Sequence, residues 1–210
     1  MTEETIVLVH GLWMNGMDMS LLARRLQKYG YRTLRFRYNG VSRSPRDNAV
    51  LLDGFVRNIE VPVIHFICHS LGGIVVRHLF YNFPVRKPGR IVTLGTPHKP
   101  SYSAYKLSRS PPGKFMLGQS TVDGLLGNVP PWSRAHDLGS IAGTLPLGMG
   151  RVLRGLPRPN DGTVTVEETR LESMKDHALV RASHFGMLLA PTTARLCHNF
   201  IKDGRFVSLP

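Results

Sequence analysis

The sequence is poor in cysteine, in acidic residues and in long apolar runs. Its 210 residues include only two cysteines, Cys68 and Cys197, which excludes a disulfide framework and a zinc site built on cysteine pairs. No apolar run approaches the roughly 20 residues of a membrane-spanning helix, and the acidic residues before Ile6 are not typical of a secretory signal. With 42% hydrophobic and 20% charged residues, the chain is expected to be a soluble, cytoplasmic, globular protein.

The shortage of acidic residues leaves a large positive charge. Only 14 Asp and Glu stand against 27 Lys and Arg, which gives a net charge of +13. Residues 18–57 and residues 99–158 each carry an excess of six positive charges. No zinc-finger spacing, RNP-type aromatic motif or basic heptad accompanies this charge, so we expect no nucleic-acid partner. The charge indicates a solvated surface or, alternatively, attraction to an anionic lipid or an acidic substrate.

Short apolar runs alternate with helical patterns through the first half of the chain. The predicted strands cover residues 5–10, 32–38, 62–68 and 90–95. Predicted helices separate them: one over 18–29, one with Val50, Leu51, Phe55 and Ile59 on its buried side, and one over 71–83. Asp47 or Asn48 is expected to cap the second helix. This alternation indicates βαβ crossovers and a parallel sheet. The arginines that alternate along 32–38 suit a strand at the sheet edge.

The second half is dominated by proline and glycine. Residues 97–160 contain nine of each, so long helices are not expected there. We predict that residues 97–158 form an irregular, lid-like loop region, with one further buried strand over 138–145. A last strand over 177–182 and a last helix over 191–202 follow. Because neither a repeat nor a linker is evident, we expect a single domain over residues 1–210.

The most informative segment surrounds Ser70. A predicted buried strand, a tight turn and a helix follow one another over residues 63–76. This is the context of the nucleophile elbow G-x-S-x-G, in which a serine on a strained turn exposes its oxygen above the strand ends. Gly72 provides the second small residue, whereas Cys68 replaces the first glycine. The pattern predicts Ser70 as a nucleophile; the alternative is a serine that only caps the helix.

Two backbone N–H groups are candidates for an oxyanion hole. Leu71 follows the predicted nucleophile at a helix N-terminus. Leu12 follows Gly11 directly after the first strand, where glycine permits an unusual backbone that presents the next N–H. The alternative is a plain glycine turn that leads into the next helix.

A serine needs a base and a group that orients the base, and in this type of site they follow in the order Asp or Glu, then His. Asp161 is predicted to lie on a loop, and His184 lies between the last strand and the last helix. The alternatives are an aspartate of an Asx turn and a hydrogen-bonded loop histidine. The weaker rivals for these roles are Asp176, His177 and His198.

Other residues are candidates for the substrate pocket. Trp13, Met14 and Met17 follow the oxyanion loop and either line an apolar acyl pocket or belong to the core. His98 follows Gly95-Thr96-Pro97 and is expected at the mouth of the site. No cluster has metal-ligand spacing, and neither G-x-G-x-x-G nor a P-loop is present, so we expect no metal and no cofactor.

Taken together, these segments resemble the α/β-hydrolase superfamily, and within it lipases and esterases such as compact bacterial lipases and GPI inositol-deacylase-like hydrolases. The matching pieces run in the family's order from residue 5 to about residue 200, and they are Val7-Leu8-Val9-His10-Gly11-Leu12, Cys68-His69-Ser70-Leu71-Gly72-Gly73, Val92 to His98, Asn160 to Val164, and Ser183-His184-Phe185-Gly186. The resemblance implies Ser70 as nucleophile, His184 as base and Asp161 as orienting acid. It also implies Leu12 and Leu71 as the oxyanion donors.

For the fold, the resemblance implies a mainly parallel sheet of strand order 1-2-4-3-5-6-7-8, with helices on both faces. The chain starts at the third strand of that sheet, so we expect the first two strands to be missing and strand 32–38 to form the edge.

The hypothesis is a serine hydrolase that cleaves carboxylic esters of a small molecule or lipid through a covalent acyl-enzyme. One alternative is a thioesterase or acyltransferase with the same three residues. Another is a non-catalytic module that binds anionic lipid or a partner protein through its basic surface.

Overall fold

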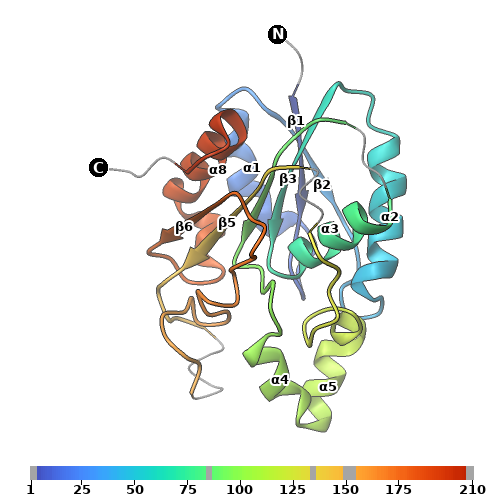
Figure 1. Ribbon diagram of the computed structural model, residues 1–210, viewed down its shortest axis with the longest axis vertical. Coiled ribbons are helices and arrows are strands. Elements are labelled where there is room, and N and C mark those ends of the chain that lie inside the picture. The colour runs from blue at the N-terminus through green and yellow to red at the C-terminus, as the bar shows by residue number, and fades with distance from the viewer. Residues whose placement is uncertain (1–3, 84–86, 133–135, 149–154, 207–210) are drawn as a thin grey trace.

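A computed structural model describes residues 4–83, 87–132, 136–148 and 155–206. Six parallel strands form one twisted sheet in the order β2-β1-β3-β4-β5-β6 (Figure 1). The strands are β1 (Glu4–Val9), β2 (Arg32–Phe36), β3 (Val63–His69), β4 (Ile91–Leu94), β5 (Leu138–Gly143) and β6 (Asp176–Val180). This is the strand order that the resemblance implies for a sheet without its first two strands. The sequence prediction is therefore confirmed, including β2 as an edge.

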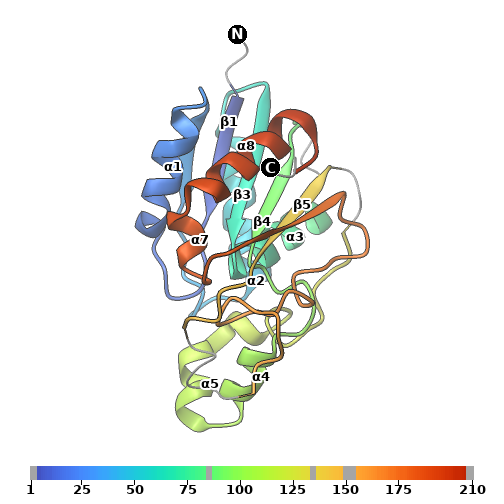
Figure 2. The same cartoon turned by 90° about the vertical axis from the view of Figure 1, so that its left-hand side faces the viewer.

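Helices cover both faces of the sheet (Figure 2). One face packs against α1 (Ser20–Gln27) and α8 (Pro191–Asp203), with Leu22, Leu26 and Phe200 fully buried. The other face packs against α2 (Pro45–Arg57) and α3 (Leu71–Asn82), where apolar side chains of both helices meet Val7, Val9 and Phe66. The continuous apolar runs of β1 and β3 follow from this burial on both faces.

The start of α2 differs from the prediction. Ser44 is the N-cap and Pro45 the first helical residue. The Ser44 Oγ accepts the N–H of Asp47 at 3.1 Å and donates to its carboxylate at 2.8 Å. Asp47 therefore lies inside the first turn, where its charge favours the helix dipole, rather than capping the helix. The prediction of Asp47 or Asn48 as the cap is wrong by one turn.

The stretch 97–158 is more regular than the sequence predicts, although residues 133–135 and 149–154 of it lie outside the described part. It contains two seven-residue helices, α4 (Tyr102–Ser108) and α5 (Pro111–Leu117), a 3-10 turn over Gly118–Thr121, and β5. Ser101 and Ser110 cap the two helices. The helices lie beyond the carboxyl ends of the strands (Figure 1).

The remaining short elements are a 3-10 turn over Met17–Met19, which precedes α1, and α7 (Gly186–Leu189), which precedes α8. Among the described residues, no helix combines the length and the apolar character needed to cross a membrane.

Candidate active site

Ser70 lies on a strained turn between β3 and α3. Its backbone has φ 52° and ψ −121°, a conformation that non-glycine residues seldom adopt. Two hydrogen bonds hold the turn: the Ser70 N–H donates to the Leu94 carbonyl at 2.9 Å, and the Thr96 hydroxyl donates to the Ser70 carbonyl at 2.8 Å. Strain of this kind persists only where neighbouring structure enforces it, and it is concentrated at functional sites.

The turn requires a close approach of α3 to β1. A Cβ atom on Gly72 would lie 2.4 Å from the Val9 carbonyl oxygen and 2.6 Å from that of His10. Cys68, which replaces the first glycine of the motif, is fully buried and pairs in the sheet with Val9 and Thr93. A thiol therefore fits at this position, whereas only glycine fits at residue 72.

Gly72→Ala is accordingly expected to lower the free energy of unfolding by about 3 kcal/mol, because the backbone of the loop after β1 must move. Gly54→Ala is the matched control. Gly54 lies in the exposed middle of α2, a Cβ atom on it would have no neighbour within 4 Å, and alanine there should raise stability by about 0.5–1 kcal/mol. Urea denaturation of both variants measures the difference, and equal stabilities would contradict the close-approach argument.

The loop after β1 lies directly against Ser70. A Cβ on Gly11 would be 3.1 Å from the Ser70 Cβ. His10 anchors this loop: its Nδ1 bonds the Gly11 carbonyl at 2.8 Å, and its ring stacks on Tyr38 at 4.3 Å. The Tyr38 hydroxyl in turn donates to the His10 carbonyl at 2.7 Å. Burial lowers the pKa of His10, which favours the neutral ring that this arrangement uses.

Leu12 and Leu71, the predicted oxyanion donors, lie close together on either side of Gly40. A Cβ on Gly40 would meet Leu71 Cδ2 at 2.9 Å and Leu12 Cδ1 at 3.2 Å. The loop after β1 and the N-terminus of α3 thus meet beside Ser70.

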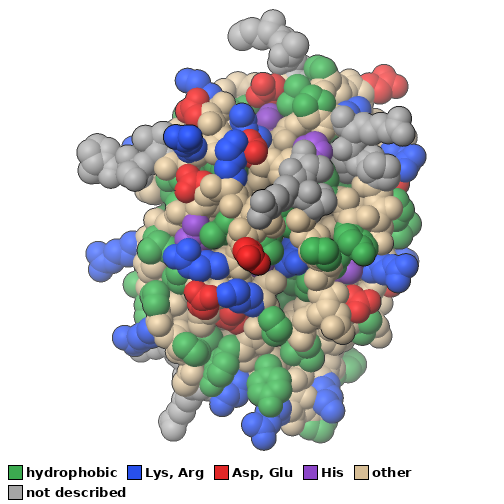
Figure 3. Space-filling model, in the orientation of Figure 1, with side chains coloured by type: hydrophobic (Ala, Val, Ile, Leu, Met, Phe, Trp, Pro, Cys, Tyr) green, Lys and Arg blue, Asp and Glu red, His purple; other side chains and the backbone are tan. Residues whose placement is uncertain are grey.

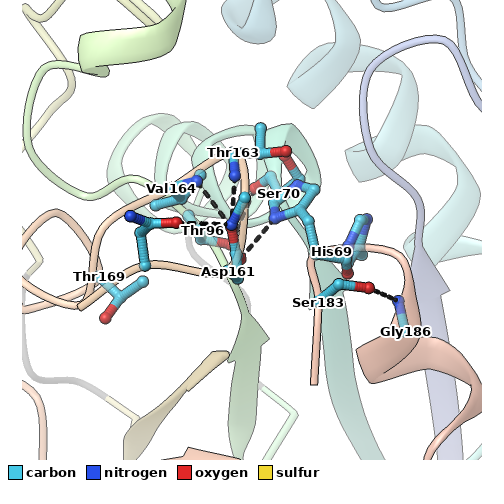
Figure 4. A network of polar contacts seen from close by, with 12 residues as sticks. His69, Ser70, Thr96, Asp161, Thr163, Val164, Thr169, Ser183 and Gly186 are labelled. Atoms are coloured by element: carbon cyan, nitrogen blue, oxygen red, sulfur yellow. Dashed lines mark hydrogen bonds and ion pairs between the residues drawn. The ribbon is translucent and has the colours of Figure 1, made fainter. Parts of the chain in front are cut away.

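Asp161 and His184 form a direct pair. The distance between His184 Nδ1 and Asp161 Oδ2 is 2.7 Å, and Asp161 is fully buried. The other carboxylate oxygen accepts the N–H groups of Thr163 at 2.9 Å and Val164 at 2.7 Å (Figure 4). The backbone N–H of His184 also donates to the Asp161 carbonyl at 2.8 Å. The carboxylate thus accepts hydrogen bonds from three donors, which offset the free-energy cost of burying its charge.

The rival residues have other partners. The Asp176 carboxylate accepts the N–H groups of His177 and Phe206 at the start of β6. The His177 Nε2 bonds the Thr169 hydroxyl, and the His198 Nδ1 bonds the Tyr31 hydroxyl. None of these bonds joins the His184–Asp161 pair.

His69, which precedes Ser70, has a role that the sequence did not indicate. Its Nε2 bonds the His184 carbonyl at 3.0 Å, and the two rings lie 4.6 Å apart. Burial, followed by the charge of His184, lowers the pKa of His69 to about 3. A neutral His69 thus donates to the loop that carries His184 and ties that loop to the elbow.

Gly95 and Thr96 were also missed as site residues. Gly95 has φ 57°, and a Cβ there would lie 3.0 Å from both Asp161 Oδ2 and His184 Nδ1. Thr96 donates to the Ser70 carbonyl, as described above. Both follow β4 directly, so the signal that could have identified them is the position of Gly-Thr-Pro at a strand end.

Ser70 and His184 open on one cavity of about 260 Å³ at the carboxyl edge of the sheet. Trp13 and Met14 line it. Most of its apolar wall comes from residues that the sequence analysis did not assign to the pocket, and these are Ala104, Leu107, Leu117, Leu125, Leu147, Val164 and Phe185. In the described part of the chain, no group of three or more His, Cys, Asp and Glu side chains could hold a metal ion.

Two pocket candidates are corrected by the structure. Met17 does not line the cavity: it is half exposed, and its sulfur meets the guanidinium groups of Arg35 and Arg37. His98 does not line it either. Its ring is buried against β4, with Nε2 3.1 Å from the Thr93 hydroxyl, and its carbonyl accepts from the buried Arg77.

The buried histidines predict a loss of stability in acid. Burial lowers the pKa of His98 and of His69 to about 3, whereas an unfolded histidine titrates near 6.5. Between these values the unfolded chain binds protons that the folded chain excludes, so stability falls as the pH falls. Each buried histidine lowers the free energy of unfolding by about 1.4 kcal/mol for each unit by which the pH falls below 6.5. For the two histidines together, the loss between pH 6.5 and pH 5 is on the order of 4 kcal/mol.

Urea denaturation at several pH values between 7.5 and 5 measures this loss. His98→Gln should reduce the slope by about 1.4 kcal/mol per pH unit. A wild-type protein that is equally stable at pH 7.5 and pH 5 would contradict the burial of two neutral rings.

Comparison with known proteins identifies the family and the fold. The sequence model of the "Alpha/beta hydrolase family" matches residues 6–200. A search of curated protein sequences returns no match. Among solved structures, the mature lipase BlEst2 of Bacillus licheniformis has a TM-score of 0.74 at 22% identity, covering 96% of this chain and 91% of that one.

Two esterase structures are also similar. The metagenomic carboxyl esterase MGS0156 has a TM-score of 0.70 at 17% identity and covers 87% of this chain and 65% of its own. The carboxylesterase CesB (YbfK) of Bacillus subtilis has a TM-score of 0.62 at 12% identity, with 96% and 84% covered. At 12–22% identity, these structural similarities show the shared fold alone.

Proposed function

The chain belongs to the alpha/beta hydrolase family, and from this premise we propose that it is a single-domain serine hydrolase that cleaves carboxylic esters. The observation that carries the proposal is that the strained turn of Ser70 and the His184–Asp161 pair open on the same apolar cavity. The structural likeness to lipases and esterases supports the choice of an ester over other substrates.

In the proposed mechanism, Ser70 Oγ attacks the ester carbonyl carbon while His184 Nε2 takes the hydroxyl proton. Asp161 keeps the proton of His184 on Nδ1 and stabilises the imidazolium that forms. The N–H groups of Leu12 and Leu71 receive the oxyanion. His184 then protonates the leaving alcohol, and water attacks the acyl-enzyme by the same sequence of steps. This chemistry uses side chains and backbone alone.

We further propose that the acyl chain of the substrate lies in this cavity and packs against its apolar wall under α4 and α5. Leu107 and Leu117 contribute to this wall from the two helices, and Met14 contributes from the loop after β1. The described residues that line this cavity of about 260 Å³ include no Lys, Arg, Asp or Glu, which favours an uncharged acyl group.

Active-site labelling tests the proposal. A fluorophosphonate probe should add once to the wild-type protein, and peptide mass mapping should locate the adduct on Ser70. The same protein should hydrolyse p-nitrophenyl esters, and a parallel assay with acyl thioesters separates an esterase from a thioesterase. A folded protein that remains unlabelled, with and without detergent, would contradict a serine hydrolase.

A further inference from the structure

The α4–α5 hairpin, residues 102–117, has two apolar faces. Its inner face is accounted for: Ala104, Leu107 and Leu117 line the cavity and pack with Leu71 and Ile74 of α3. Its outer face carries large apolar side chains in solvent. Phe115 is 85% exposed, Tyr105 56% and Met116 47%.

A phenylalanine this exposed lowers the solubility of a protein and stabilises nothing in the described structure. Contiguous exposed apolar side chains mark sites of association with another surface.

The same face is basic. Lys106, Arg109 and Lys114 lie on the hairpin, and the sequence has no acidic residue between Lys99 and Asp123. In the described part of the chain no carboxylate pairs with any of these three cations, whereas Lys99, Arg57, Arg90 and Lys175 all have acidic partners. Figure 3 shows hydrophobic and basic side chains side by side at the lower end of the molecule, where Figure 1 has α4 and α5.

The hairpin also adjoins the mouth of the cavity. The Trp13 Nε1–H donates to the Met116 carbonyl at 2.9 Å, and Trp13 lines the cavity beside Ser70. Leu147 and Phe185, two further lining residues, are about half exposed, as Trp13 is. An apolar rim thus continues from the outer face of the hairpin to the entrance of the site.

From these observations we propose that the outer face of the α4–α5 hairpin docks on an anionic lipid bilayer. Cations that have no carboxylate partner among the described residues, with interspersed aromatic and aliphatic side chains, suit a surface that is negatively charged outside and apolar within. An acidic protein would match the charge, but it would need a pocket shaped to Phe115, whereas a bilayer provides an apolar layer wherever the hairpin meets it. Docking in this orientation brings the mouth of the cavity to the lipid. The proposal concerns binding and does not depend on the hydrolysis proposed above.

Vesicle sedimentation tests the proposal on the full chain. Vesicles of phosphatidylglycerol with phosphatidylcholine should sediment the wild-type protein, and vesicles of phosphatidylcholine alone should not. The double variant Lys106→Glu, Lys114→Glu should bind at least about 25-fold more weakly, since each basic residue near an anionic surface contributes about fivefold. Phe115→Ser should weaken binding about tenfold.

Matched controls separate docking from general attraction to a basic protein. The double variant Arg24→Glu, Lys28→Glu changes the net charge equally on exposed positions at the end of α1, where Lys28 is the C-cap; α1 lies away from α5 (Figures 1 and 2). Tyr81→Ser removes an exposed aromatic residue of α3. Both should bind as wild type does. Trp13 fluorescence, independent of any variant, should shift to the blue on binding, because the other tryptophan, Trp132, is already buried.

Three outcomes would overturn the proposal. The wild-type protein does not sediment with anionic vesicles; or the α1 variant loses as much binding as the hairpin variant; or light scattering shows a dimer that Phe115→Ser dissociates, in which case the face is an interface between copies of this chain. Because all substituted side chains are at least partly exposed, thermal unfolding should change little in any variant.

Discussion

Ser70→Ala is expected to lower kcat for ester hydrolysis by on the order of 10⁶-fold and to abolish labelling by a fluorophosphonate. The variant removes the hydroxyl of the strained turn, which lines the same cavity as His184, and no acyl-enzyme can then form. The remaining activity should reflect binding and the oxyanion donors alone, which in enzymes of this type still exceed the reaction in water by 10³–10⁴-fold. Steady-state hydrolysis of a p-nitrophenyl ester and intact mass after labelling measure the two effects.

A double variant with His184→Ala tests whether Ser70 and His184 act together. If the two residues act as one unit, the double variant Ser70→Ala, His184→Ala should be no slower than Ser70→Ala by itself. Ser42→Ala, on an exposed loop before α2, is a serine control that should keep the wild-type rate. A Ser70→Ala protein that retains more than about a hundredth of the wild-type activity would point to another nucleophile, because loss of the attacking hydroxyl should lower kcat on the order of 10⁶-fold.

The elbow was predictable because it is local. The apolar run of β3, the Ser70 turn and the small residues of α3 are adjacent in the chain, and glycine at residue 72 follows from a backbone contact that no other side chain allows. The strand order was predictable because parallel strands joined by helices permit few topologies. The arginines of β2 identified the edge because a charged side chain is tolerated only where one side of a strand is open.

The cavity wall could not be predicted in the same way. Leu107, Leu117 and Leu125 line the site only because α4 and α5 fold back over the strand ends, and this depends on contacts between distant segments. His98 follows the Gly-Thr-Pro turn, so its position in the sequence indicated the mouth of the site. Its ring instead turns back to Thr93, and a one-dimensional pattern does not encode that direction.

The proline and glycine content of 97–158 was misleading for a related reason. Pro111 and Pro112 occupy the first turn of α5, where proline favours a helix, and Ser110 caps it. The number of prolines in the segment argues against helices. Two of these prolines, however, directly follow Ser110, and at that position proline favours the start of a helix. Position relative to a cap therefore carries more information here than composition.

Asp161→Asn is expected to lower kcat by about 10⁴-fold near neutral pH while leaving the fold intact. The reason lies in the two carboxylate oxygens. Oδ1 accepts the N–H groups of Thr163 and Val164, so the amide oxygen of an asparagine must take this place and its NH₂ group must face His184. The Nδ1 of His184 then has to accept a hydrogen bond, which moves the ring proton to Nε2 and removes the base that Ser70 needs.

Asp176→Asn is the matched control, because Asp176 competes with Asp161 on sequence grounds but bonds the backbone N–H groups of His177 and Phe206. That variant should keep its kcat within a few-fold, since it leaves the tautomer of His184 unchanged. The comparison uses kcat at several pH values together with urea denaturation of both variants. Equal losses of kcat in the two variants would contradict the proposal that Asp161 is the residue that orients His184. So would an Asp161→Asn protein that is fully active, because the 2.7 Å contact would then hold the loop without setting the proton on His184.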